Sequence, residues 1–235
     1  MVHFLKTFLF SLVILIVALT FVVFSPGRAI LKEKGKGVSA AEDSSAQIEG
    51  RAKDAALEEI RDARIREKAA EALSFCESNG CSTEFCVLID MKIHSGKHRM
   101  FIYDFSKQEV GRMALATHGS GRDEAQSTHD EPLFGNAPGS NLTSLGKYLT
   151  GARAYSNWGI NVHYKMHGLD TTNSNAFRRI VVLHSYTPIP AYEIYPEHLP
   201  LGWSQGCPVT DDETMAYLDL KLRGIDKPAL VWIYY

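Results

Sequence analysis

The sequence carries very little net charge. It holds 25 Lys and Arg residues against 27 Asp and Glu residues, so its formal net charge is −2 at pH 7. Bulk electrostatics therefore give no reason to expect a nucleic-acid partner. The chain also lacks internal repeats and any collagen-like or generally disordered composition. With 235 residues, it is long enough for one domain with a sizeable core and additional flanking segments.

Cysteine is scarce, and the spacing of the cysteines limits which disulfides or metal sites they could form. The four cysteines are Cys76, Cys81, Cys86 and Cys207. Two of the first three, which lie around an Asn-Gly turn signal at 79–80, would form a local disulfide in an oxidising compartment, or all three stay reduced. No fourth ligand follows them at a fitting spacing, so the pattern predicts no metal site. No cofactor is expected either.

Only one long hydrophobic run occurs, and it lies near the N-terminus. Residues 7–24 are almost wholly apolar and follow Lys6, which is typical of an export signal or of a short membrane-spanning helix. Small residues after Pro26 would allow cleavage. Residues 1–29 are therefore interpreted as a membrane anchor or a signal peptide, and the anchor is preferred. Because the nearby positive charges lie mainly after the run, the positive-inside rule does not fix the orientation.

Two segments separate this run from the remaining chain. Residues 30–50 are rich in Lys, Gly, Ser, Ala and Glu without a sustained apolar period, which predicts a flexible tether. Residues 51–75 place apolar side chains at helical spacing among charged ones, with no Pro or Gly. This pattern predicts an amphipathic helix that packs on the following domain or serves as a stalk.

Short strands dominate the last part of the sequence, residues 76–235. Gly- and Pro-containing turns separate apolar runs at 85–93, 99–105, 110–117, 142–151, 162–166 and 230–234. Residues 122–140 form a polar loop, and acidic residues at 211–213 open a short helix to about residue 222. The pattern predicts a mainly β fold, a sandwich or barrel with short helices.

The candidate chemistry lies in residues 179–185 and 202–209. The first stretch has four consecutive apolar residues before His184, which is typical of a buried strand that ends in polar residues. The second is a Gly-punctuated turn that presents Cys207 before a proline. If folding brings the two together, the imidazole accepts the thiol proton and stabilises the thiolate. A lone Cys is more often a small core residue, but Ser204 and Gly206 favour an exposed turn.

These residues resemble a known signature. His184-Ser185 and the later Ser204-x-Gly206-Cys207 are similar to the active-site motif of the L,D-transpeptidases (the YkuD type), in the branch of murein L,D-transpeptidase catalytic domains. The resemblance covers about residues 85–235 and is supported by stretches at 87–90, 101–104, 138–148 and 166–169. It implies a barrel-like catalytic fold in which Cys207 is the nucleophile, His184 the general base, and Ser185 the residue whose main-chain carbonyl orients the imidazole.

Besides Cys207, four residues are candidates for substrate binding. The N–H groups of Gly206 and Cys207 suit an oxyanion hole, and Ser204 either bonds the substrate backbone or holds the turn. Trp203 lines the cleft or packs in the core. His167 is a competing base, a substrate-side donor or a structural histidine.

The resemblance implies a cell-envelope cysteine acyltransferase on the periplasmic face, anchored in the inner membrane or exported. Cys207 would attack the carbonyl of the L-centred diamino acid in a peptidoglycan stem peptide and release the terminal D-alanine. An amine of a neighbouring stem would then take the acyl group, or water would in an L,D-carboxypeptidase.

The sequence departs from the wider family at Gln205 and Val209, where His and then Arg or Asn are usual. These departures motivate one alternative, a non-catalytic peptidoglycan-binding domain on a membrane tether. A more distant alternative is an envelope thiol hydrolase that does not act on murein.

Overall fold

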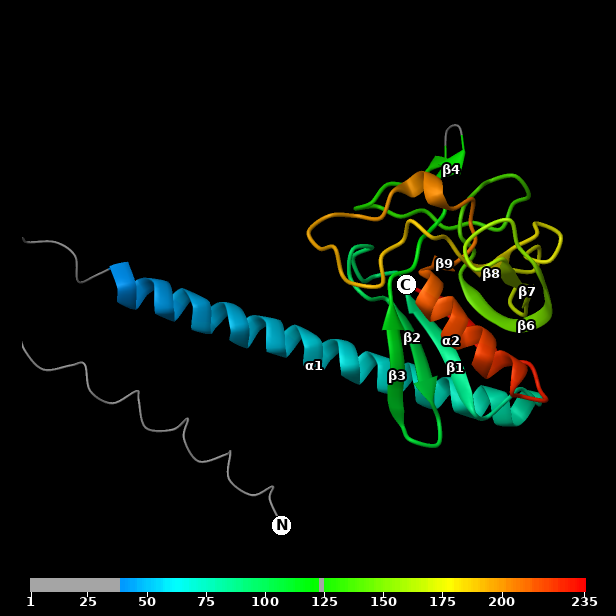
Figure 1. Cartoon of the computed structure of the whole chain (residues 1–235), viewed down its shortest axis with the longest axis horizontal. Coiled ribbons are helices and arrows are strands. Elements are labelled where there is room, and N and C mark those ends of the chain that lie inside the picture. Colours follow the sequence, from blue (N-terminus) through cyan, green and yellow to red (C-terminus); the bar gives the residue numbers. More distant parts are fainter. Residues whose placement is uncertain (1–38, 123–124) are drawn as a thin grey trace, which may run out of the picture. The chain divides into compact units, whose positions relative to one another are not determined.

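The computed structural model describes residues 39–122 and 125–235 (Figure 1). The chain divides into two units, Met1–Arg51 and Ala52–Tyr235, and the second holds the β-sheet. The predicted membrane anchor or signal peptide, at 1–29, lies outside the described residues. Within 39–122 and 125–235, no helix is both long enough and apolar enough to cross a bilayer.

The first helix, α1, runs from Ser39 to Asn79. It includes the amphipathic helix predicted at 51–75 and begins within the range predicted as a tether, where Ala, Glu and Gln favour helix. Its buried residues, Ile65, Ala69, Ala72 and Cys76, follow helical spacing and pack on one side of the sheet. The helix ends before Gly80, whose left-handed φ of 68° stops it.

The domain is built on one nearly closed, barrel-like sheet (Figure 1), which confirms the mainly β prediction. Its order is β3-β2-β1-β10-β6-β7-β8-β9, and the pairs β1–β10 and β8–β9 are parallel. The eight strands are β1 Phe85–Asp90, β2 Met100–Asp104, β3 Glu109–Ala114, β6 Gly146–Tyr155, β7 Val162–Gly168, β8 Val182–Ser185, β9 Val209–Thr210 and β10 Leu230–Tyr234. A separate two-stranded ladder pairs β4 Gly121–Arg122 with β5 Ala125–Gln126.

Strand β1 is covered on both faces. Phe85, Val87 and Ile89 belong to the main core, which also contains residues of helix α2. Cys86 and Leu88 face the second cluster, under α1. This double coverage explains why β1 is a continuous apolar run rather than an alternating one.

Helix α2 runs from Asp212 to Arg223, close to the short helix predicted at 211–222. The side chain of Asp211 accepts a hydrogen bond from the N–H of Thr214 at 2.8 Å and caps the helix. Acidic residues fill the first turn and basic residues the last, which complements the helix dipole. Leu218 is fully buried in the main core, whereas Leu220 is 66% exposed.

The cysteines of the first group are free thiols. Cys76, Cys81 and Cys86 are all buried in the cluster under α1. Of the two states that the sequence left open, the structure has the reduced one.

The packing of α2 predicts different effects for two leucines of the same helix. Leu218→Ala should lower the free energy of unfolding by about 2–5 kcal/mol, because it leaves a cavity in the main core. Leu220→Ala should change it by less than about 0.5 kcal/mol. Chemical denaturation of both variants measures the difference, and equal losses would contradict this packing.

Candidate active site

A cleft of about 500 Å³ opens beside β7, β8 and the turn before β9. Cys207, His184 and His163 lie in its lining, together with the aromatic side chains of Tyr155, Trp158, Tyr186 and Trp203. No Lys, Arg, Asp or Glu is among the described residues that line it. The reactive groups of the cleft are therefore a thiol and two imidazoles in mainly aromatic and neutral polar surroundings.

The pairing of β8 with β9 brings the thiol and the imidazole together. The register sets His184 opposite Val209, so Cys207, two residues earlier, lies beside Val182. The N–H of Val182 donates to Cys207 Sγ at 3.5 Å. In β8, Leu183 is buried in the core, and Val182 and His184 on either side of it line the cleft. The side chains of His184 and Cys207 thus share one wall.

The ring of His184 is oriented by its own strand. Its Nδ1 lies 2.9 Å from the carbonyl oxygen of Ser185, and because a carbonyl only accepts, Nδ1 carries the hydrogen. Nε2 remains as the proton acceptor. Burial lowers the pKa of His184, the Ser185 carbonyl partly opposes this, and His163 lowers the pKa further. The predicted role of the Ser185 main chain thus has the geometry that it needs.

Cys207 is a shielded thiol. Its Sγ donates a long hydrogen bond, of 3.9 Å, to the carbonyl of Ile180. Burial raises the pKa of the thiol, while the N–H of Val182 and the charge of Arg179 lower it. A base is therefore needed to remove its proton at neutral pH.

Ser204 holds the turn that contains Cys207. Its hydroxyl donates to the Cys207 carbonyl at 2.7 Å and accepts from the Gly206 N–H at 3.0 Å. Of the two predicted oxyanion donors, the Gly206 N–H is thus engaged within the turn. Gly206 has a φ of 111°, and a Cβ there would lie 2.6 Å from the Leu142 carbonyl oxygen, so the turn requires glycine.

Trp203 belongs to an aromatic wall. It meets Tyr186 edge to face at 5.5 Å between ring centroids, and Tyr186 meets Trp158 in the same way at 5.6 Å. Gln205 is exposed and also lines the cleft. This wall offers flat apolar surface beside the thiol.

His167 is outside the cleft lining. It lies on β7, is exposed, and stacks on Phe177 at 5.0 Å. Its strand contributes His163 instead, which is the direct partner of His184 across β7 and β8. No local sequence pattern assigns His163 a role, because only the register of this antiparallel pair shows which histidine faces the cleft.

Other histidines gather beyond the turn that contains Cys207. Arg99 Nη2 lies 3.0 Å from His118 Nδ1, and both residues are buried. His198 stacks on His94 at 3.7 Å and on His129 at 4.4 Å. No local sequence pattern marks His118 as buried, because its partner Arg99 comes from a distant strand connection.

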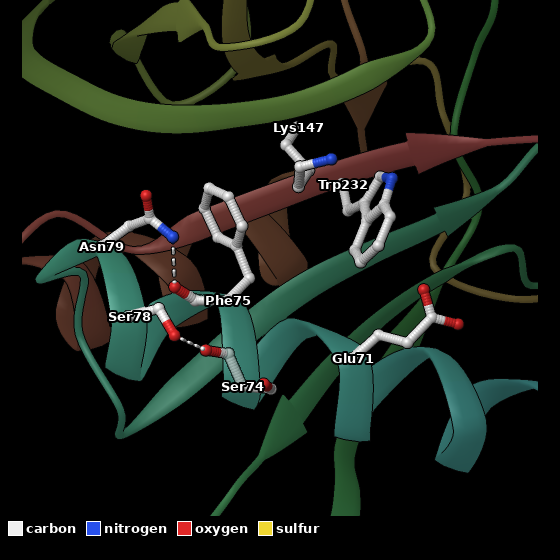
Figure 2. A pocket seen from close by; sticks show the side chains of 7 residues that line it. All are labelled: Glu71, Ser74, Phe75, Ser78, Asn79, Lys147 and Trp232. Atoms are coloured by element: carbon white, nitrogen blue, oxygen red, sulfur yellow. Dashed lines mark hydrogen bonds between the residues drawn. The ribbon is translucent and has the colours of Figure 1, made fainter.

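A second hollow, of about 410 Å³, lies at the end of α1 (Figure 2). Lys147 Nζ lies 4.8 Å from the ring of Trp232 and 5.4 Å from that of Phe75. The polar side chains of Ser78 and Asn79 bond to carbonyls of their own helix (Figure 2). These groups dock the helix on the sheet and present no converging reactive side chains.

Residues 58–234 match the model of the family described as the L,D-transpeptidase catalytic domain. Two solved structures of the helical cell shape determining protein Pgp2 from Campylobacter jejuni, one of them a point mutant, are also similar. The mutant has a TM-score of 0.41 and 12% identity, the other 0.39 and 14%, and each match covers 63% of this chain and 46% of that one. The chain thus spans less than half the length of these structures. No curated protein matches the sequence significantly.

The buried His118 predicts acid sensitivity. Burial and the charge of Arg99 lower its pKa from 6.5 to about 4, so the unfolded chain binds a proton that the folded chain excludes. The free energy of unfolding should therefore fall between about pH 6.5 and pH 4, by up to about 3 kcal/mol from this residue.

Chemical denaturation at several pH values measures this loss. His118→Gln should flatten the pH dependence, and His167→Gln, at an exposed site, should leave it as in the wild type. An unchanged slope in His118→Gln would contradict the assignment.

Proposed function

The chain belongs to the family of L,D-transpeptidase catalytic domains, and from this premise we propose that it transfers acyl groups of peptidoglycan stem peptides through a thioester at Cys207. One observation carries the proposal. Cys207 and His184 line the same cleft, and the Ser185 carbonyl holds the imidazole with Nε2 free.

The resting pair is uncharged. Burial raises the pKa of the Cys207 thiol and lowers that of the His184 imidazole. The thiol and the neutral imidazole are therefore favoured over the ion pair until substrate enters. Proton transfer then accompanies attack, which protects the thiol from side reactions in the free enzyme.

In the first half-reaction, His184 Nε2 takes the Sγ proton and the sulfur attacks the carbonyl carbon of the diamino acid. The C–S bond forms, the C–N bond to the terminal D-alanine breaks, and the imidazolium gives its proton to the departing amine. In the second, the acceptor amine attacks the thioester, a C–N bond forms and the C–S bond breaks. The amine proton passes through His184 back to the sulfur.

The lining of the cleft supports a peptide substrate held largely by stacking and neutral hydrogen bonds. Trp158, Tyr186 and Trp203 supply flat surfaces, and Asn157 and Gln205 supply amide groups. Water as the acceptor would use the same residues and make the protein an L,D-carboxypeptidase. We place the enzyme on the periplasmic face of the envelope, reached through residues 1–29 as an anchor or export signal.

Product analysis tests this function. Purified protein is incubated with tetrapeptide stems as donor and acceptor, and mass spectrometry follows free D-alanine, crosslinked dimer and tripeptide. Cys207→Ala should abolish all products, and His184→Gln should lower the rate by about 10²–10⁴-fold. His167→Gln, a histidine outside the cleft lining, should keep wild-type activity.

Dimer formation would identify a transpeptidase, and tripeptide without dimer a carboxypeptidase. Full activity in Cys207→Ala would contradict the thioester. Equal losses in His167→Gln and His184→Gln would contradict the choice of base.

A further inference from the structure

Arg179 lies behind the turn that contains Cys207 and has an unusual set of partners. Its Nη1 donates to the Ser144 hydroxyl at 2.6 Å and to the Gly135 carbonyl at 3.0 Å. Its Nη2 donates to the Leu142 carbonyl at 2.6 Å. One side chain thus ties the 135–144 loop to the segment that leads into β8.

The positive charge of Arg179 is not neutralised by its partners. All three acceptors are neutral, although a guanidinium ordinarily pairs with a carboxylate. Within 39–122 and 125–235, Arg179 makes no ion pair with an acidic side chain. The group is half-buried, where a charge is screened less than at the surface. A neighbouring anion would compensate it.

Tyr148 and Cys207 are the two groups whose ionised forms would raise the pKa of Arg179. Burial raises the pKa of Tyr148, and its hydroxyl donates to the Ser144 carbonyl, so Cys207 is the more readily ionised of the two.

A Cβ added to Gly206 would lie 3.1 Å from Arg179 Nη2, so the guanidinium lies close to the backbone of the residue that precedes Cys207. Ile180, directly after Arg179, has a φ of 58°, which is rare for a β-branched residue. Its carbonyl faces Cys207 Sγ. Burial raises the pKa of the Cys207 thiol, and the Val182 N–H and the charge of Arg179 oppose this shift. Burial lowers the pKa of Arg179, and Tyr148 and Cys207 oppose that shift.

The other candidate charges do not act on the resting thiol. His184 is neutral where burial has lowered its pKa. Val209, two residues after Cys207, is a buried apolar side chain and supplies no charge. The fixed positive charge comes from the segment before β8.

We propose that Arg179 is a positioning residue for the nucleophile, whose guanidinium stabilises the Cys207 thiolate and holds the 135–144 loop against the turn. This role of Arg179 rests on the proposed function, in which the Cys207 thiolate is the attacking group.

The test is the rate at which iodoacetamide alkylates Cys207, measured at a series of pH values. Peptide mapping assigns the alkylated site, and the other three cysteines are buried. Arg179→Gln should move the midpoint of the rate profile to higher pH and lower the rate at pH 7 by about fivefold to tenfold, since the thiolate fraction changes about tenfold per pH unit. Arg179→Lys, which keeps the charge, should stay near the wild-type midpoint. Arg178→Gln, its exposed neighbour, should match the wild type.

A purely structural role gives another pattern. If Arg179→Gln and Arg179→Lys lower the rate equally at every pH without moving the midpoint, the inference is overturned. His184→Gln provides a test that does not depend on the folding of either Arg179 variant. Its midpoint should stay near that of the wild type, because Arg179 remains. A large rise in this variant would show that the imidazolium supplies the charge, and would also overturn the inference.

Alkylation needs no stem peptide, so the two proposals fail separately. If Arg179→Gln shifts the alkylation midpoint but the wild type is inactive toward stem peptides, the role of Arg179 is supported and the proposed substrate is rejected. Acyl transfer without any midpoint shift would keep the proposed function and reject the role of Arg179.

Discussion

The parallel pairing of β8 with β9 is the contact on which the site depends. β9 is only Val209–Thr210, yet its register against β8 sets Cys207 beside Val182 and on the same wall as His184. A shift of one residue would turn the neighbouring side chains to the opposite face. The bonds of Thr117 to the Val209 N–H and the Cys207 carbonyl fix this register from the other side. The position of Cys207 is therefore set by backbone geometry.

Burial determines the charge state of this site. It favours the neutral thiol and the neutral imidazole. At the thiol, the Val182 N–H and the charge of Arg179 oppose this effect of burial, and at the imidazole the Ser185 carbonyl opposes it. The cleft therefore favours the protonated thiol at rest. The Ser185 carbonyl holds the His184 ring in place, and the Ser204 hydroxyl engages the Gly206 N–H within the turn.

Local patterns predicted the elements that are long or strongly apolar. The strands β1 and β10 were predicted because their burial gives continuous apolar runs. The capped helix α2 was predicted from the acidic residues in its first turn. Cys207 and His184 were predicted from their motif, and both line the cleft. β9 is too short to show a period, and the roles of His163 and Arg179 depend on register and on contacts with a distant loop. No local pattern encodes such contacts.

The most direct test of the account is the intact mass of the protein after incubation with a carbapenem, with the wild type beside Cys207→Ala. A β-lactam opened by the thiolate stays attached through a thioester and adds the whole mass of the drug. The account predicts one adduct on the wild type and none on the folded Cys207→Ala variant. Adducts on both proteins, or no adduct on the folded wild type, would contradict an activated nucleophile at Cys207.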